Sequence, residues 1–121
     1  MTALPALFDL LRDFALAFEG AHEDHPFGEA VNVFKAANGK MFVLCSESAE
    51  GWLRASLKLT PDEALAALSL PFVSPAPYLA RHSWVQSVCT TETELEITLE
   101  WVRHSHQLVA AGARRKAGRG R

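Results

Sequence analysis

The sequence predicts an α+β fold, with an antiparallel sheet of about four strands, an N-terminal helix, a short middle helix and a long C-terminal helix. Three patterns support this prediction. Residues 31–45 are two apolar runs separated by Asn38-Gly39, which is typical of a β-hairpin. Residues 53–59 alternate strictly between apolar and polar side chains, as a half-buried strand does. Helix-start signatures at Thr60 and Thr91 precede the last two helical patterns.

The first predicted element is an amphipathic helix within residues 4–18. Its apolar side chains recur every three or four positions, and charged residues fall off that stripe. Pro5 is tolerated in the first turn of a helix, and Gly20 suits the end of one. We expect the apolar stripe to lie on the sheet.

Residues 21–30 are expected to be a solvated loop between this helix and the hairpin. His22 and His25 stand three apart with two acids between them, which is a donor set that zinc accepts. No third ligand follows at a recognisable spacing, so the loop is the preferred interpretation. The sequence predicts no metal site and no cofactor.

The hairpin of residues 31–45 is the centre of the predicted sheet. Asn38-Gly39 favours a two-residue primed turn, in which both residues have positive φ. Lys35 and Lys40 bracket this turn among apolar neighbours. A hairpin with one apolar face is unstable alone in water, so helices must cover that face.

Residues 53–59 are predicted to direct leucine and alanine side chains to the core, and Arg54 and Lys58 to solvent. The sequence Thr60-Pro61-Asp62-Glu63 is a capping box that starts a short helix, which stops before Pro71. Residues 70–78 contain three prolines, so we expect a stiff loop rather than a helix or a central strand. Residues 83–89 are the fourth predicted strand.

The last helix is predicted to begin at a second capping box, Thr91 with Glu94, and to end at Gly112. It has two apolar faces, one through Leu95 and Leu99 and one through Trp101 and Leu108, which suggests that it lies between the sheet and a further packing partner, such as a second subunit. The domain is therefore expected to span residues 1–112, followed by a basic tail over residues 113–121.

Charge is distributed unevenly along the 121 residues. The formal net charge is −2, from 12 Lys and Arg against 14 Asp and Glu. Five of the cations lie in the last eight residues, so the chain up to Gly112 has 7 cations against 14 acids, a charge of −7. An acidic body with a basic tail differs from a uniformly basic DNA-binding domain.

Cys45 and Cys89 lie in strand-like runs and are expected to be buried thiols of a reducing compartment. A disulfide between them requires adjacent strands, which spacing alone does not decide. No apolar run approaches the roughly 18 residues of a membrane span, and acids interrupt the N-terminal apolar pattern, so we expect no signal peptide. The expected location is the cytoplasm.

Motifs that would indicate catalysis are missing from the sequence. It has no glycine-rich phosphate loop, no GxSxG, no HExxH and no CxxC. We therefore predict no catalytic residues and a protein that is not an enzyme.

The order of several motifs resembles the MmcQ/YjbR family. They are HPFGEAVNVFKAANGKMFVL, SLKLTPDEA, a P-x-P-Y, a cation shortly before SWV, and a helix ending in S-x-x-LV, from about His25 to Val109. The resemblance implies a compact α+β domain like that of CyaY, with DNA binding through a double wing of hairpin loops.

Residues that match the family pattern are the candidate nucleic-acid or ligand contacts. They are Lys35, Lys40, Lys58, Tyr78, Arg81 and Trp84, to which the tail adds Arg114, Arg115 and Lys116. The two aromatic residues are available for base stacking and the cations for phosphates. The turn SESAEG, a second potential wing, carries Glu47 and Glu50 and would repel phosphate.

Three functions are compatible with this sequence. The first is non-catalytic DNA binding through a basic sheet face and the tail. The second is a protein–protein interaction module or homodimer without nucleic-acid binding. The third is a small-ligand-binding protein or enzyme, with a pocket lined by Tyr78, Trp84 and the lysines. A membrane is not an expected partner.

Overall fold

The computed structural model describes residues 6–119, and the side chains of residues 6–111. The elements, in chain order, are α1 (Leu7–Leu16), β1 (His22–Asp24), β2 (Asn32–Lys35), β3 (Met41–Glu47), β4 (Leu53–Lys58), α2 (Pro61–Ala67), β5 (Val73–Pro75), the 3₁₀ turn η1 (Ala80–His82), β6 (Trp84–Cys89) and α3 (Glu92–Arg119). The strands form one antiparallel sheet in the order β1-β2-β3-β4-β6-β5. The α+β prediction is confirmed, with six strands rather than about four.

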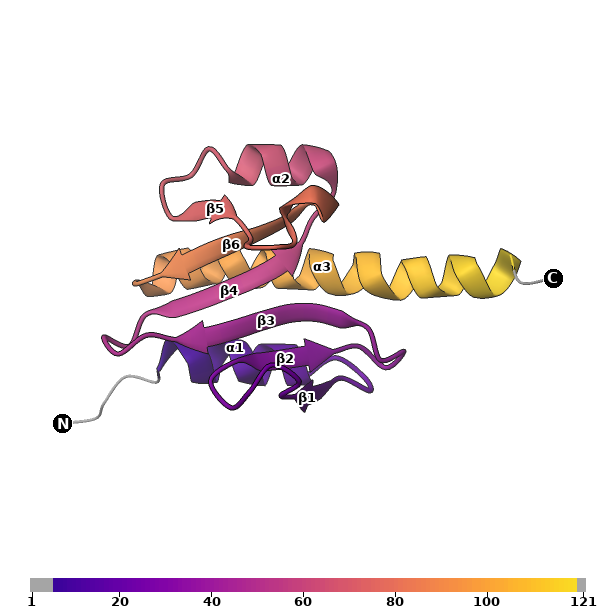
Figure 1. Ribbon diagram of the computed structural model, residues 1–121, viewed down its shortest axis with the longest axis horizontal. Helices are drawn as coiled ribbons and strands as arrows, with labels where there is room; N and C mark the ends of the chain where they lie inside the picture. The colour runs from indigo at the N-terminus through magenta and orange to yellow at the C-terminus, as the bar shows by residue number, and fades with distance from the viewer. Residues whose placement is uncertain (1–5, 120–121) are drawn as a thin grey trace.

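Helices α1 and α3 lie behind the sheet in Figure 1, and α2 lies beyond its β5 edge. We call the covered side the helix face and the other side the open face. Register decides which residues share a face, because directly opposed residues point the same way. Val43 is opposite Leu57, and Leu57 is opposite Val85, and all three are buried on the helix face.

The apolar side of the alternation over residues 53–59 is confirmed, whereas Ser56, on the side expected to face solvent, is buried as well. Leu53, Ala55 and Leu57 are fully buried against the helices. Arg54 is exposed on the open face as expected, whereas Lys58 is only half-buried. None of the described helices crosses the open face (Figure 1).

The turn between β2 and β3 differs from the predicted primed type. Only Gly39 has a positive φ, of 83°. The amide of Gly39 donates to Ala36 O at 2.8 Å, and the amide of Ala36 donates to Lys40 O at 2.8 Å. This is a three-residue loop that ends in a left-handed glycine. The Asn38 side chain accepts from the Lys40 amide at 2.9 Å, so Asn38 stabilises the turn through its side chain rather than through a positive φ.

Two strands lie where the sequence predicted loops. β1 occupies part of the 21–30 segment and pairs with β2, and β5 occupies part of the proline-rich segment and pairs with β6. Both are three-residue edge strands. Proline is compatible with an edge strand because its missing N–H need not find a partner strand there. The expectation that 70–78 holds no central strand is therefore consistent with Pro75 in β5.

Both predicted helix starts have capping hydrogen bonds. The hydroxyl of Thr60 accepts from the Glu63 amide at 3.2 Å, and the Glu63 carboxylate accepts from the Thr60 amide at 3.1 Å, which completes the box. At α3 the Thr91 hydroxyl accepts from the Glu94 amide, but the Glu94 carboxylate accepts from the amide of Thr90 instead of Thr91. Only the bond to the Thr91 hydroxyl is therefore as predicted, and the return bond of the second box reaches the preceding residue.

Helix α3 continues through Gly112 to Arg119, so the predicted end at Gly112 is wrong. A glycine inside a helix costs about 1 kcal/mol relative to alanine, and the alanine, arginine and lysine around it are good helix formers. The second apolar face of α3 is covered in part by the same chain, because the Trp101 ring stacks on Phe72 with centroids 6.3 Å apart. No helix of residues 6–119 is long and apolar enough to cross a membrane.

The turn that follows α1 approaches the β2–β3 turn closely at Gly20, which leads to a prediction. Gly20 has a φ of 75°, and a Cβ there would lie 2.6 Å from the Ala37 Cβ. Gly39 has a similar φ of 83° but open space around it. Both alanine substitutions should cost about 1–2 kcal/mol for the left-handed conformation, and Gly20→Ala should cost more because of the clash. Urea unfolding of the two variants tests this, and equal losses would contradict it.

Candidate nucleic-acid interface

Several predicted contact residues meet at one end of the open face. Lys58 at the end of β4 is directly opposite Trp84 at the start of β6, and Lys35 at the end of β2 is opposite Met41 at the start of β3. The turn that holds Lys40 closes β2 and β3 at this same end. We call this region, with Lys35, Lys40, Lys58 and η1, the cationic end of the sheet.

The loop between β5 and β6 brings Tyr78 and Arg81 to the cationic end. The amide of Leu59 donates to Ser83 O at 3.1 Å, which fixes the end of η1 beside the end of β4. Tyr78 is 99% exposed and has a φ of 65°. A left-handed φ is strained for a bulky residue, and such strain occurs often at binding sites. Figure 1 shows η1, the end of β4 and the β2–β3 turn on the same side of the molecule.

Trp84 does not offer a free ring. Only 7% of its surface is exposed, so a base cannot stack on it. The interpretation that either aromatic residue is available for stacking therefore holds for Tyr78 alone. Sequence patterning did not distinguish the two, because each lies three positions from Arg81 and near a strand end.

The cations differ in how far they are neutralised. Lys35 Nζ donates to Asp24 Oδ2 at 2.7 Å, so a carboxylate already balances this lysine. Lys40, Lys58 and Arg81 form no ion pair with a carboxylate of the described residues. The nearby carboxylate of Glu63 is engaged by Thr60 and lies 2.8 Å from His104 Nδ1. Three cations are thus free to meet an anion at this end.

The acidic turn of residues 46–51 lies at the opposite end of the sheet. It joins β3 to β4, whereas the turn with Lys40 joins β2 to β3, so the length of β3 separates them. Seven residues of strand span about 20 Å, twice the Debye length at 0.1 M salt. Glu47 and Glu50 therefore do not repel an anion bound at the cationic end.

The tail residues Arg114, Arg115 and Lys116 lie on the C-terminal part of α3 rather than on an irregular tail. Their side chains lie outside the described part of the structure. The helix backbone that carries them extends past the sheet on the same side as the cationic end (Figure 1).

The histidine-rich segment forms a hydrogen-bonded cluster around Glu23 in β1. Its carboxylate accepts from Asn32 Nδ2 at 2.7 Å and from Arg12 Nε at 2.8 Å, and His25 Nε2 lies 3.1 Å away. Desolvation of the carboxylate opposes its ionisation, but the bonds from Asn32 and Arg12 outweigh it and hold the pKa of Glu23 below 4.5. No group of three or more potential metal ligands occurs among residues 6–111.

The lowered pKa predicts how stability responds to acid. Ionised Glu23 stabilises the folded protein fully above its ordinary pKa of 4.5, and this contribution is lost as pH falls through the lower folded value. The free energy of unfolding should therefore decrease less in Glu23→Gln than in the unmodified protein between neutral and acid pH. Urea titrations at each pH test this, with the exposed Glu19→Gln as the control, and parallel curves for Glu23→Gln and the unmodified protein would contradict it.

The two cysteines do not pair. Cys45 is on β3 and Cys89 on β6, and β4 lies between them, so the condition for a disulfide is not met. Burial raises the pKa of the Cys45 thiol to about 12 and raises that of Cys89 as well. Both thiols are therefore poor nucleophiles at neutral pH.

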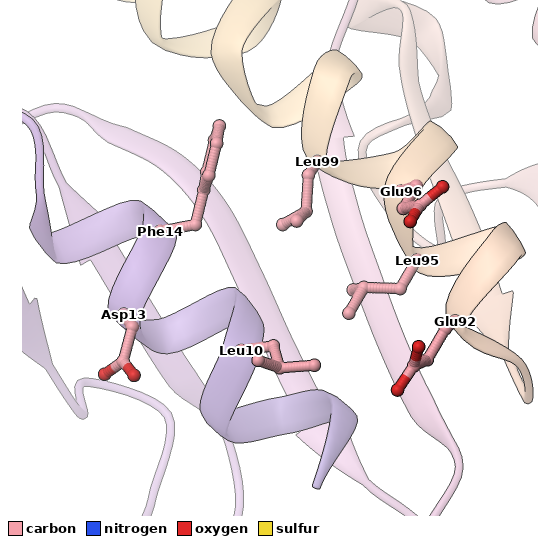
Figure 2. Close-up of a pocket in the computed structure, with 7 residues that line it drawn as sticks. All are labelled: Leu10, Asp13, Phe14, Glu92, Leu95, Glu96 and Leu99. Carbon is pink, nitrogen blue, oxygen red and sulfur yellow. The ribbon is translucent and has the colours of Figure 1, made fainter. Parts of the chain in front are cut away.

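A groove that sequence reasoning missed lies between α1 and α3. It encloses about 560 Å³ and is lined by Leu10, Phe14, Leu95, Leu99 and three acids, Asp13, Glu92 and Glu96. Acids in the first turns of a helix stabilise its positive terminus, so Glu92 and Glu96 alone do not indicate a groove. Only the packing of α1 beside α3 brings Asp13 to the same site (Figure 2).

Comparisons with known proteins agree with the motif order. A family model described as YjbR matches residues 16–108. The crystal structure of the Deinococcus radiodurans protein DR2400, which has the domain DUF419, is similar, with a TM-score of 0.74 and 25% identity over 84% of this chain and 77% of that one. A Pseudomonas syringae protein has the same fold, with a TM-score of 0.66 and 18% identity over 83% of this chain and 96% of the other. No curated protein matches the sequence. Because the family model spans most of its length, the chain belongs to the YjbR family.

Proposed function

We propose that this protein binds nucleic acid without catalysis, through the cationic end of its open sheet face. The observation that carries the proposal is the placement of three cations at the same end of the sheet as the exposed ring of Tyr78. These cations, none paired with a carboxylate of the described residues, are Lys40, Lys58 and Arg81. The cations suit phosphates, and the ring suits an unpaired base.

Charge placement explains how an acidic protein would bind a polyanion. The body carries −7 overall, but the acidic turn lies at the far end of the sheet. Arg114, Arg115 and Lys116 are on a helix that extends on the side of the cationic end (Figure 1). Each phosphate neutralised by a cation releases counterions, so binding should be weak and strongly salt-dependent.

Fluorescence anisotropy with a labelled single strand and the corresponding duplex, over a salt series, tests the proposal. For duplex DNA, the slope of log affinity against log salt should flatten by about 0.9 for each phosphate that the protein no longer neutralises. We therefore expect slopes flatter by about 0.9 for Lys58→Gln and Arg81→Gln. Replacing Arg114, Arg115 and Lys116 together with glutamine should flatten the slope by up to about 2.7.

A matched control lies on the same strand as Lys58. Arg54 is exposed on the open face of β4, at the opposite end from Lys58. Arg54→Gln removes the same charge and should leave the slope unchanged. Tyr78→Ala should weaken single-strand binding by about 1–3 kcal/mol, with a smaller effect on the duplex. Absence of binding at low salt, or an equal effect of Arg54→Gln and Lys58→Gln, would contradict the proposal.

A further inference from the structure

The groove between α1 and α3 combines an apolar floor with an acidic margin. In Figure 2, Leu10 of α1 and Leu95 and Leu99 of α3 point into the gap between the two helices. Asp13, Glu92 and Glu96 line its margin; in Figure 2 the Glu92 carboxylate is turned toward the gap, whereas that of Asp13 is directed away from α3. None of the three forms an ion pair within residues 6–111. An occupant of matching chemistry would be cationic, with small apolar side chains.

The C-terminal segment of this chain has that chemistry. Residues 113–121 read ARRKAGRGR, with five cations and with alanine and glycine as the remaining residues. Residues 113–119 continue α3 and extend past the sheet (Figure 1). The segment carries a charge of +5, whereas the body of residues 1–112 carries −7, so the segment and the body are complementary in charge.

The segment cannot reach the groove of its own molecule. The groove is at the N-terminal end of α3, around Glu92, whereas the basic segment is at the C-terminal end of the same helix. A helix from residue 92 to residue 119 is about 40 Å long, and it holds the two ends apart. Any occupant of this composition must therefore come from another molecule.

We propose that the groove between α1 and α3 binds the basic C-terminal helix of a second copy of this chain. Each copy offers one groove and one basic helix, so association produces a two-fold dimer where the exchange is reciprocal, and open chains or a larger ring where it is not. The groove is small and its rim is charged, so the association should be weak and should decrease with salt. The inference uses tail cations that the proposed function assigns to nucleic acid, but its test contains no nucleic acid, so the two proposals can fail separately.

Sedimentation velocity of the full-length protein at low and high salt tests the proposal. We expect the average mass to rise with concentration at low salt and to approach the monomer value at high salt. Association should weaken at least tenfold in Glu92→Lys/Glu96→Lys, and equally in Arg114→Glu/Arg115→Glu/Lys116→Glu. The control Glu47→Lys/Glu50→Lys changes the net charge by as much as the groove variant Glu92→Lys/Glu96→Lys does, but away from the groove. This control should still associate.

Mixing the two reversed variants gives the most specific result. The reversed tail of one variant complements the reversed groove of the other, so the mixture should associate although neither variant does so alone. Thermal unfolding of each variant distinguishes a weakened interface from an unfolded protein. A monomeric unmodified protein at low salt, equal weakening in the control, or no association of two folded variants in the mixture would each overturn the proposal.

Discussion

Phe42→Ala is expected to lower the free energy of unfolding by about 3–5 kcal/mol, which is the range for a fully buried phenylalanine. Phe42 has no exposed surface and lies at the start of β3, where the sheet meets α1 and α3. Its ring contacts Phe18 edge-on at 5.7 Å between centroids and His106 edge-on at 5.0 Å. His106 in turn stacks on Phe18 at 4.0 Å. Removing Phe42 takes away the ring that both others contact.

Urea unfolding measures the effect of Phe42→Ala. Phe27 is the matched control, because 66% of its surface is exposed and Phe27→Ala should change stability by no more than about 0.5 kcal/mol. A loss below about 1 kcal/mol for Phe42→Ala would mean that the three rings are not the packed junction described.

Ser105→Ala should have the second large effect, at about 2–4 kcal/mol, because it leaves two buried backbone groups without partners. The buried hydroxyl of Ser105 on α3 inserts where β3 and β4 stop pairing. It accepts from the Lys58 amide at 3.0 Å and donates to Phe42 O at 2.6 Å. Alanine supplies neither bond, and the site is closed to solvent.

Hydrogen exchange gives the more specific readout of Ser105→Ala. The Lys58 amide should exchange faster, while amides in the paired part of β4 should change only with global stability. Ser69→Ala is the control, because its hydroxyl donates to Ala66 O at 2.7 Å on the exposed surface, and its removal should cost no more than about 0.5 kcal/mol. An unchanged Lys58 exchange rate would contradict the bridging role.

Elements that depend on local sequence were predictable. The capping box of Thr60 and Glu63 depends only on atoms within four residues. In residues 53–59 the apolar positions of the pattern identify the side chains that point into the core. Elements that depend on distant partners were not. β1 is too short and polar to be recognised alone, because it becomes a strand through pairing with β2. The same holds for β5, whose one proline, Pro75, is acceptable only at an edge.

The candidate site was predictable in part for the same reason. The alternation of residues 53–59 places Lys58 on the open face, and the predicted turn places Lys40 at the end of the hairpin strands. The neutralisation of Lys35 by Asp24 could not be foreseen, because it needs β1 beside β2. The burial of Trp84 also depends on tertiary packing. The α1–α3 groove brings together residues about 80 positions apart, and no local pattern encodes that contact.

Amide chemical-shift mapping during titration with a short DNA duplex or single strand at low salt tests the central claim most directly. The account predicts shifts concentrated in residues 36–40, at Lys58 and in residues 78–84, which reverse when salt is added. Residues that line the α1–α3 groove should not shift directly. Shifts confined to α1 and the first half of α3, or no shifts at low salt, would contradict the assignment of nucleic-acid binding to this end of the sheet.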